Sequence, residues 1–209
     1  MDDFQKSVFI EYYFNSIDFI AQKARADLVI DVFDSIAQEF DLEKETKEFK
    51  EANFNPYKNI EDRKIELTKE FFKQELTKIK KTLNPKQAQS YKTLSKIKKE
   101  NWLNDDQFKV LIYFDFAAKN YAFLKLIQAI DNPIRQEFCF MQILLKMKSE
   151  KVINSFDKIF RKKLIQIKTH GSSNYIAYFT PFDKSTKAYE NFENIAYKKT
   201  STNFTQKHS

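Results

Sequence analysis

Gly171 is the only glycine among the 209 residues of this chain, where an average usage of about 7% would give roughly fifteen. Loops that cradle phosphate groups need several glycines, because glycine lets the backbone approach a ligand closely and adopt positive φ. Walker loops, dinucleotide-binding turns and kinase-type flaps are therefore excluded. One glycine and four prolines are also too few for the many tight turns of a sheet-rich fold. The composition predicts helices joined by short polar turns.

The remaining composition predicts a folded intracellular protein. Apolar residues form 42% of the chain and include 22 phenylalanines and 10 tyrosines, enough for one extended or two compact helical units. Cys139 is the only cysteine, so no intrachain disulfide can form, which suits a reducing compartment. Residues 1–3 are acidic and polar, unlike a secretory signal. The most apolar run, 110–130, contains three charged side chains and predicts a buried helix instead of a membrane span.

Residues for metal or acid-base chemistry are scarce. His170 and His208 are the only histidines, and Cys139 has no second cysteine with which to build a zinc site. A polar turn explains His170 beside Ser172 and Ser173, since no carboxylate or oxyanion-binding loop accompanies them. Five polar residues at helical spacing are interpreted as a solvated stripe: Asp27, Asp31, Asp34, Gln38 and Asp41. The sequence predicts no enzyme, no cofactor, no metal and no small-molecule substrate.

The net charge of +7 is segregated along the chain. Residues 1–55 hold six basic and thirteen acidic groups, a net −7, whereas 73–99 hold nine lysines and one glutamate, a net +8. Residues 146–168 hold eight basic and two acidic groups, a net +6. Clustered lysines attract polyanions by displacing counterions, and they contact phosphates without reading bases. The candidates in the first cluster are Lys78, Lys80, Lys81, Lys86, Lys92, Lys96, Lys98 and Lys99.

Two interpretations of this charge stay open. In one the lysines form a phosphate-binding surface, and in the other they form an ordinary solvated helix face. The acidic segment 1–55 would either mask the basic surface or dock a basic partner. The sequence does not choose between these.

Helical patterns fill the first hundred residues. Residues 4–40 contain no glycine or proline and repeat apolar residues at helical spacing, which predicts one long helix or two abutting ones. Apolar residues from 65 to 83 recur at steps of seven, four, three and four, like the seam of a coiled coil. Asn84-Pro85 predicts the capped start of a further helix, which runs to about Glu100. These last two helices are interpreted as a hairpin, either a basic arm or a dimerisation element.

Residues 102–147 carry the pattern of three short helices. A capped helix begins after Asn104, a shorter one begins at Tyr121, and Asn132-Pro133 predicts the start of a third over 134–145. Three helices in about 46 residues have the size of a helix-turn-helix unit.

This pattern resembles a Myb/SANT repeat, a relative of the homeodomain. In that family an initial Trp, here Trp102, precedes an acidic turn, here Asp105-Asp106, and an aromatic residue, here Phe123, opens the second helix. The resemblance covers less than a quarter of the chain. It implies DNA binding or protein contact within a nuclear assembly, such as an adenine methyltransferase complex with small homeobox-like subunits.

The third helix departs from the DNA-reading pattern of that family. Its basic candidates for nucleic-acid contact are Arg135 and Lys146. The segment 100–145 is net acidic, and part of the presumed groove-facing surface is apolar. This face is expected to contact protein through Phe138, Phe140 and Met141.

Residues 152–164 predict an amphipathic helix with a second basic surface. Its basic residues are Lys158, Arg161, Lys162 and Lys163. Two apolar runs then flank a turn at Gly171 and are interpreted as a small β-hairpin. A helix followed by a hairpin is similar in order to winged-helix proteins. Residues 200–209 are expected to be a flexible tail.

The predicted fold class is mainly α, a multi-helix bundle that contains the three-helix Myb/SANT-like module and a small C-terminal β-hairpin. Its segments are acidic helical (1–55), basic hairpin (56–100), Myb/SANT-like (101–148), basic helix with hairpin and final helix (149–199) and tail (200–209). We expect a non-catalytic nuclear protein that binds nucleic acid, double-stranded DNA in particular, and scaffolds the protein subunits of a larger complex, away from membranes. The alternative is a helical protein-interaction adaptor or inhibitor that binds no nucleic acid.

Overall fold

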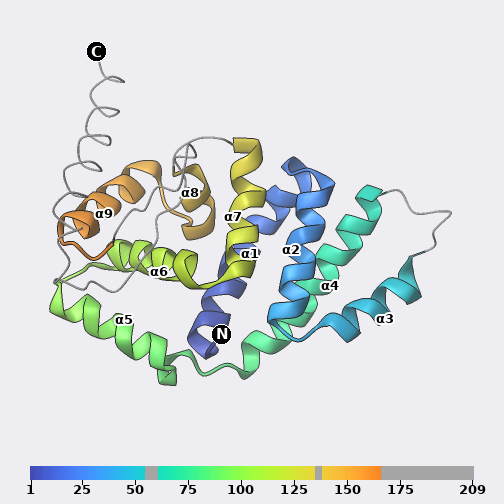
Figure 1. Cartoon of the computed structure of the whole chain (residues 1–209), viewed down its shortest axis with the longest axis horizontal. Coiled ribbons are helices and arrows are strands. Elements are labelled where there is room, and N and C mark those ends of the chain that lie inside the picture. Colours follow the sequence, from blue (N-terminus) through green and yellow to red (C-terminus); the bar gives the residue numbers. More distant parts are fainter. Residues whose placement is uncertain (55–60, 135–137, 166–209) are drawn as a thin grey trace, which may run out of the picture.

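The chain forms a bundle of helices in the computed structural model, which describes residues 1–54, 61–134 and 138–165 (Figure 1). Helices fill most of these ranges and no strand occurs within them, which confirms the mainly α-helical prediction. The elements are α1 (Asp3–Lys23), α2 (Ala26–Glu39), α3 (Glu43–Asn53), α4 (Glu61–Thr82), the 3₁₀ helix η1 (Pro85–Gln87), α5 (Gln89–Glu100), α6 (Asp105–Lys119), α7 (Tyr121–Ile134), α8 (Cys139–Leu145) and α9 (Ser149–Arg161).

Helix α1 is the centre of the core. It packs against α4, α7, α8 and η1, and Figure 1 shows it crossing the middle of the bundle. Its Ile10, Tyr13, Ile17 and Ile20, spaced three and four residues apart, are all fully buried. Helix α2 packs on α7 and α4, and α6 packs on α9. Buried residues from α1 to α9 form a single core, so the described residues make one packed unit.

The predicted helical run 4–40 is two helices. The backbone becomes extended at Ala24 (φ −81°, ψ 158°), where α1 ends, and α2 begins at Ala26. The acidic stripe predicted for this run is exposed. Three of its carboxylates form ion pairs: Asp27 with Arg25, Asp31 with Lys125 Nζ at 2.9 Å, and Asp34 with Lys50 Nζ at 3.6 Å. The stripe is therefore a solvated face with a few ion pairs.

Helices α4 and α5 do not pack as the predicted hairpin. Helix α4 buries Ile65, Phe72 and Leu76 of its seam and packs on α1 and α2, whereas α5 rests on η1 and α1. Figure 1 shows the two helices on different parts of the bundle. The apolar seam of α4 joins the main core, and Pro85 opens a short 3₁₀ turn that redirects the chain. The basic segment therefore lies along the bundle and does not project from it.

The start of α5 is held by acidic residues of the α1 terminus. Asn84, the predicted cap, makes no side-chain capping bond. The carboxylate of Asp2 instead accepts hydrogen bonds from Gln5 N–H of α1, at 3.0 Å, and from Ser90 of α5. Asp3 accepts a bond from the Asn84 N–H at 2.8 Å. One acidic dipeptide therefore caps two helices and fixes α5 against α1.

Four helices are closed by a residue in the left-handed conformation, where glycine is usual. These residues are Asp41, Trp102, Lys146 and Lys163, with φ between 49° and 60°. The backbone N–H of the following residue bonds to the carbonyl oxygen five positions earlier: Leu42 to Ala37, Leu103 to Lys98, Met147 to Gln142 and Leu164 to Ile159. Each following side chain lies in or against the core. A chain with one glycine thus closes these helices with strained residues, and the adjacent apolar burial offsets the strain.

The helices of 102–147 are α6, α7 and α8, and the third is shorter than predicted. Asn104 caps α6 as predicted, and Gln107 makes the cap reciprocal, with bonds of 2.9 and 3.2 Å. The prediction of a helix start at Asn132-Pro133 is wrong, because α7 continues to Ile134 and α8 begins only at Cys139. Pro133 lies instead in the last turn of α7, where it forgoes one backbone hydrogen bond, and the helix ends one residue later. These helices pack on one another and also on α1, α2 and α9.

Part of the predicted chain lies outside the described residues. This part includes Arg135, the hairpin around Gly171 with His170, Ser172 and Ser173, the final helix before residue 199, and the tail 200–209.

Candidate nucleic-acid interface

Lysines from two distant stretches of the sequence meet along one border of the bundle. The end of α4, η1 and α5 follow this border in Figure 1, and the end of α9 approaches the end of α5. We define the basic edge as Lys78, Lys80, Lys81, Lys86, Lys92, Lys96, Lys98, Lys99, Lys158, Arg161, Lys162 and Lys163.

A hydrogen bond joins the two halves of the basic edge. The ammonium group of Lys162, at the end of α9, donates to the backbone carbonyl oxygen of Asn101 at 2.5 Å. Asn101 is the C-cap of α5, where carbonyl oxygens lack helical partners and the helix dipole favours a cation. Because this carbonyl group carries no net charge, the bond does not neutralise the positive charge of Lys162. Lys158 lies one turn earlier on the same face of α9.

Six lysines of the basic edge are exposed and make no side-chain hydrogen bond or ion pair with the described residues. They are Lys80, Lys81, Lys86, Lys92, Lys99 and Lys158. Others are paired: Lys78 with Glu75 at 2.6 Å, Lys96 with Glu100 at 3.7 Å, Lys98 with Asp105 at 2.5 Å, and Arg161 with Asp157 at 2.9 Å. The bond from Lys98 lowers the pKa of Asp105. The six unpaired lysines are the members most available to a phosphate.

Helix α5 presents a cationic row. Lys92, Lys96 and Lys99 follow one another at steps of four and three, which places their side chains along one side of the helix. They border an open hollow together with Tyr91, Ser95 and Glu100. Successive turns of a helix are about 5.4 Å apart, so the row offers ammonium groups at intervals suited to a chain of negative charges.

Trp102 lies at the joint between the two halves of the basic edge. It directly follows Asn101, which accepts the Lys162 bond, and it is 89% exposed. It is not among the residues that pack against the core. The indole therefore contributes little to the stability of the fold.

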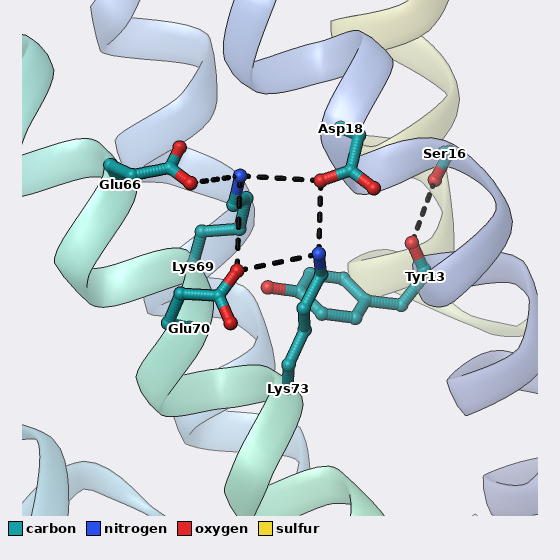
Figure 2. A network of polar contacts seen from close by, with 7 residues as sticks. All are labelled: Tyr13, Ser16, Asp18, Glu66, Lys69, Glu70 and Lys73. Carbon is teal, nitrogen blue, oxygen red and sulfur yellow. Dashed lines mark hydrogen bonds and ion pairs between the residues drawn. The ribbon is translucent and has the colours of Figure 1, made fainter.

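A second cluster of charges, between α1 and α4, is satisfied internally (Figure 2). The ammonium of Lys69, a residue only 7% exposed, lies 2.5 Å from Glu66 and 3.2 Å from Asp18. Lys73 lies 2.9 Å from Asp18 and 3.4 Å from Glu70. Hydrogen bonds from Lys73 and Lys69 lower the pKa of Asp18 against the raising effect of its partial burial. This cluster clamps α4 to α1 and so positions the lysines at the end of α4.

Lys146 lies apart from the basic edge. It closes α8 just before the start of α9, whereas Lys162 lies beyond the other end of that 13-residue helix. At 1.5 Å per residue the two ends of α9 are about 20 Å apart. The structure thus does not bring Lys146 together with the other predicted nucleic-acid contacts, and Arg135 is not described.

The predicted protein-contact residues are largely used within the chain. Met141 is fully buried and is therefore a core residue rather than a surface contact. Phe138 and Phe140 are half-buried, with ring centroids 5.1 Å from Phe156 and 5.9 Å from Tyr113, respectively. A docking role for these two phenylalanines stays a prediction.

No group of three or more His, Cys, Asp or Glu residues in the described ranges is arranged to hold a metal ion. In the same ranges, none of the helices combines the length and the apolar character needed to cross a bilayer. Comparisons of the chain with protein-family models, with curated proteins and with solved structures found no match. The resemblance of residues 102–147 to a Myb/SANT repeat therefore stays a prediction.

Sequence reasoning found the lysines of the basic edge but missed their convergence. No spacing rule connects Asn101 with Lys162, which is 61 positions further along the chain. Trp102 was interpreted only as the first residue of a module. Its position directly after a lysine-rich helix was the signal that pointed to a role at the charged surface.

Proposed function

We propose that this protein binds the phosphate backbone of nucleic acid through the basic edge, as a non-catalytic scaffolding subunit of a nuclear assembly. The observation that carries the proposal is the convergence of the α5 and α9 cations at the Asn101–Lys162 bond. Lysines that served only solubility would do so equally well when scattered over the surface. Because the lysines of the basic edge lie together along one border, they favour a single extended anionic partner.

The affinity of such an interface comes mainly from counterion release. Each phosphate neutralised on duplex DNA contributes about 0.9 to the slope of log K against log salt. Six contacts would therefore weaken binding roughly a thousandfold between 50 and 200 mM salt. Because lysine contacts do not read bases, we expect weak sequence preference. Duplex DNA, implied by the Myb/SANT resemblance, and single strands both present the required phosphates.

The test is fluorescence anisotropy with a labelled 30-base-pair duplex at 50 and 200 mM salt. The edge variant carries Lys86→Gln, Lys92→Gln and Lys99→Gln. The matched control removes three exposed lysines on the acidic part of the chain and carries Lys23→Gln, Lys44→Gln and Lys47→Gln. The edge variant is expected to bind roughly a hundredfold more weakly at 50 mM salt, and the control to change less than about threefold.

Two results would contradict the proposal. The first is the absence of binding by the unaltered protein at 50 mM salt, which would favour the alternative of a protein-interaction adaptor. The second is an equal loss in the edge variant and the control, which would show that only net charge matters.

A further inference from the structure

Neither the packing of the core nor the backbone conformation at position 102 favours a tryptophan. It is the most exposed large apolar residue in the described part of the chain. Its φ of 53° lies in the left-handed region, which is unfavourable for a bulky residue. The end of α5 is closed by the bonds from the backbone of Trp102 to Lys99 and from Leu103 to Lys98, and by the burial of Leu103. The indole has no part in this closure.

The charges around Trp102 are net positive. Lys99, three residues before it, has no partner among the described residues, and the ammonium of Lys162 is bound to the carbonyl oxygen of Asn101, the adjacent residue. The three nearest carboxylates along the chain are each paired with a lysine: Glu100 with Lys96 at 3.7 Å, Asp105 with Lys98 at 2.5 Å and Asp106 with Lys151 at 3.3 Å. The indole therefore projects from a surface whose unneutralised charge is positive.

An exposed aromatic ring beside a row of cations suits one kind of partner in particular. Proteins that bind single-stranded nucleic acid combine a positive track for the backbone with aromatic side chains on which bases stack. Inside a duplex the bases are already paired and stacked on one another, so no base face is open for an indole to stack on. An apolar hot spot of a protein interface is instead ringed by contacts that exclude water. Of the six residues within three positions of Trp102, Lys99, Glu100 and Asp105 are charged and exposed, and only the buried Leu103 is apolar.

We propose that the basic edge takes single-stranded nucleic acid and that Trp102 is the platform on which an unpaired base stacks. This inference rests on the proposed function, because the lysines of the basic edge hold the phosphates on either side of the stacked base. Every base has a π-face, so the platform does not depend on sequence.

The sole tryptophan makes the inference directly measurable. Trp102 is the only tryptophan among the 209 residues, so the intrinsic tryptophan emission reports this site alone. The full chain is titrated with labelled (dT)20, labelled (rU)20 and a labelled 30-base-pair duplex. Label anisotropy measures binding, and matched unlabelled strands measure quenching of the emission. We expect a single strand to quench the emission strongly and the duplex to bind with little quenching.

Three variants complete the test. Trp102→Ala should weaken single-strand binding about tenfold or more and leave duplex binding unchanged. Trp102→Phe keeps a stacking ring and should stay within about threefold of the unaltered protein. Tyr121→Ala removes another strongly exposed aromatic ring of the described residues, 65% exposed at the start of α7, and should change neither single-strand nor duplex binding. The thermal unfolding midpoint of each variant verifies that it is folded.

The outcomes separate this inference from the proposed function. Salt-sensitive binding of all probes, with no quenching and no effect of Trp102→Ala, would overturn the stacking platform and leave phosphate binding intact. Absence of binding to every probe at 50 mM salt would overturn both. A Trp102 emission that shifts with anionic vesicles and not with either single strand would overturn the inference in favour of a lipid surface.

Discussion

Asp2 and Ser90 are joined by two hydrogen bonds, in which the Asp2 carboxylate accepts from the Ser90 backbone N–H at 3.0 Å and from its hydroxyl at 2.8 Å. Partial burial acts to raise the pKa of Asp2, but the bonds from Gln5 and Ser90 outweigh it and lower the pKa below 3.8. The α5 half of the basic edge is thus anchored by an acidic residue of α1.

The anchor predicts a specific dependence of stability on pH. Asp2→Ala should lower the free energy of unfolding by about 1–2 kcal/mol near pH 6, since the caps of two helices are lost. The folded-state pKa of Asp2 is lowered, so its contribution is complete above the unfolded-state pKa and is lost as the pH falls through the folded-state value. Urea unfolding between pH 6 and pH 2.5 should show the difference from the unaltered protein shrinking towards acid. A difference that is constant over this range would contradict the assignment.

The clamp between α1 and α4 predicts unequal effects for two lysines. Lys69→Ala should cost about 2 kcal/mol, because Lys69 is nearly buried and its ammonium group lies between Glu66 and Asp18. Lys47→Ala, which removes an exposed pair with Glu51, should cost less than about 0.5 kcal/mol. Urea unfolding at pH 7 measures both values, and equal losses would show that the clamp is not structural.

A buried hydroxyl predicts a stabilising substitution. The Tyr13 hydroxyl has no hydrogen-bond partner among the described residues, and burial raises the pKa of this phenol well above its ordinary value. Tyr13→Phe should therefore raise the free energy of unfolding by up to about 1 kcal/mol. Tyr13→Ala should lower it by roughly 3–5 kcal/mol, because a core cavity is opened. A loss of stability in Tyr13→Phe, measured by urea unfolding, would show that the hydroxyl is bonded in solution.

The residues in the left-handed conformation at helix ends predict that glycine at these positions would stabilise the protein. Asp41→Gly and Lys146→Gly should each stabilise the protein by about 0.5–1 kcal/mol, since glycine adopts φ near 50–60° without steric strain. The control is Glu11→Gly, at an exposed position inside α1, which should cost about 1 kcal/mol. Differential scanning calorimetry of the three variants compares them under one condition. Loss of stability at all three sites would mean that the left-handed conformation carries no strain to relieve.

The sequence predicted those features that depend on local signals. The Asn104–Gln107 cap and the buried seam of α4 were predictable because capping chemistry and helical spacing operate within a few residues. The end of α7 was misplaced because Asn-Pro commonly signals the start of a helix, whereas Pro133 here lies in the last turn of one.

Long-range contacts were beyond such reasoning. The bonds from Ser90 to Asp2 and from Lys162 to Asn101 span 88 and 61 positions, and they form only because the core brings the helix ends together. The lysines of the candidate site were therefore found as two separate stretches. Only the structure shows that the two stretches meet and that Trp102 is exposed.

The central claim is that α5 and α9 supply one continuous phosphate-binding surface, and the salt dependence of binding tests it most directly. Three proteins are compared with the unaltered chain: one with Lys92→Gln and Lys99→Gln, one with Lys158→Gln and Lys162→Gln, and one with all four changes. Dissociation constants for a 30-base-pair duplex are measured from 50 to 300 mM salt. Each pair should reduce the slope of log K against log salt by about 1.8, and the four together by about 3.6. An unchanged slope in either pair would show that the two helices do not bind one partner.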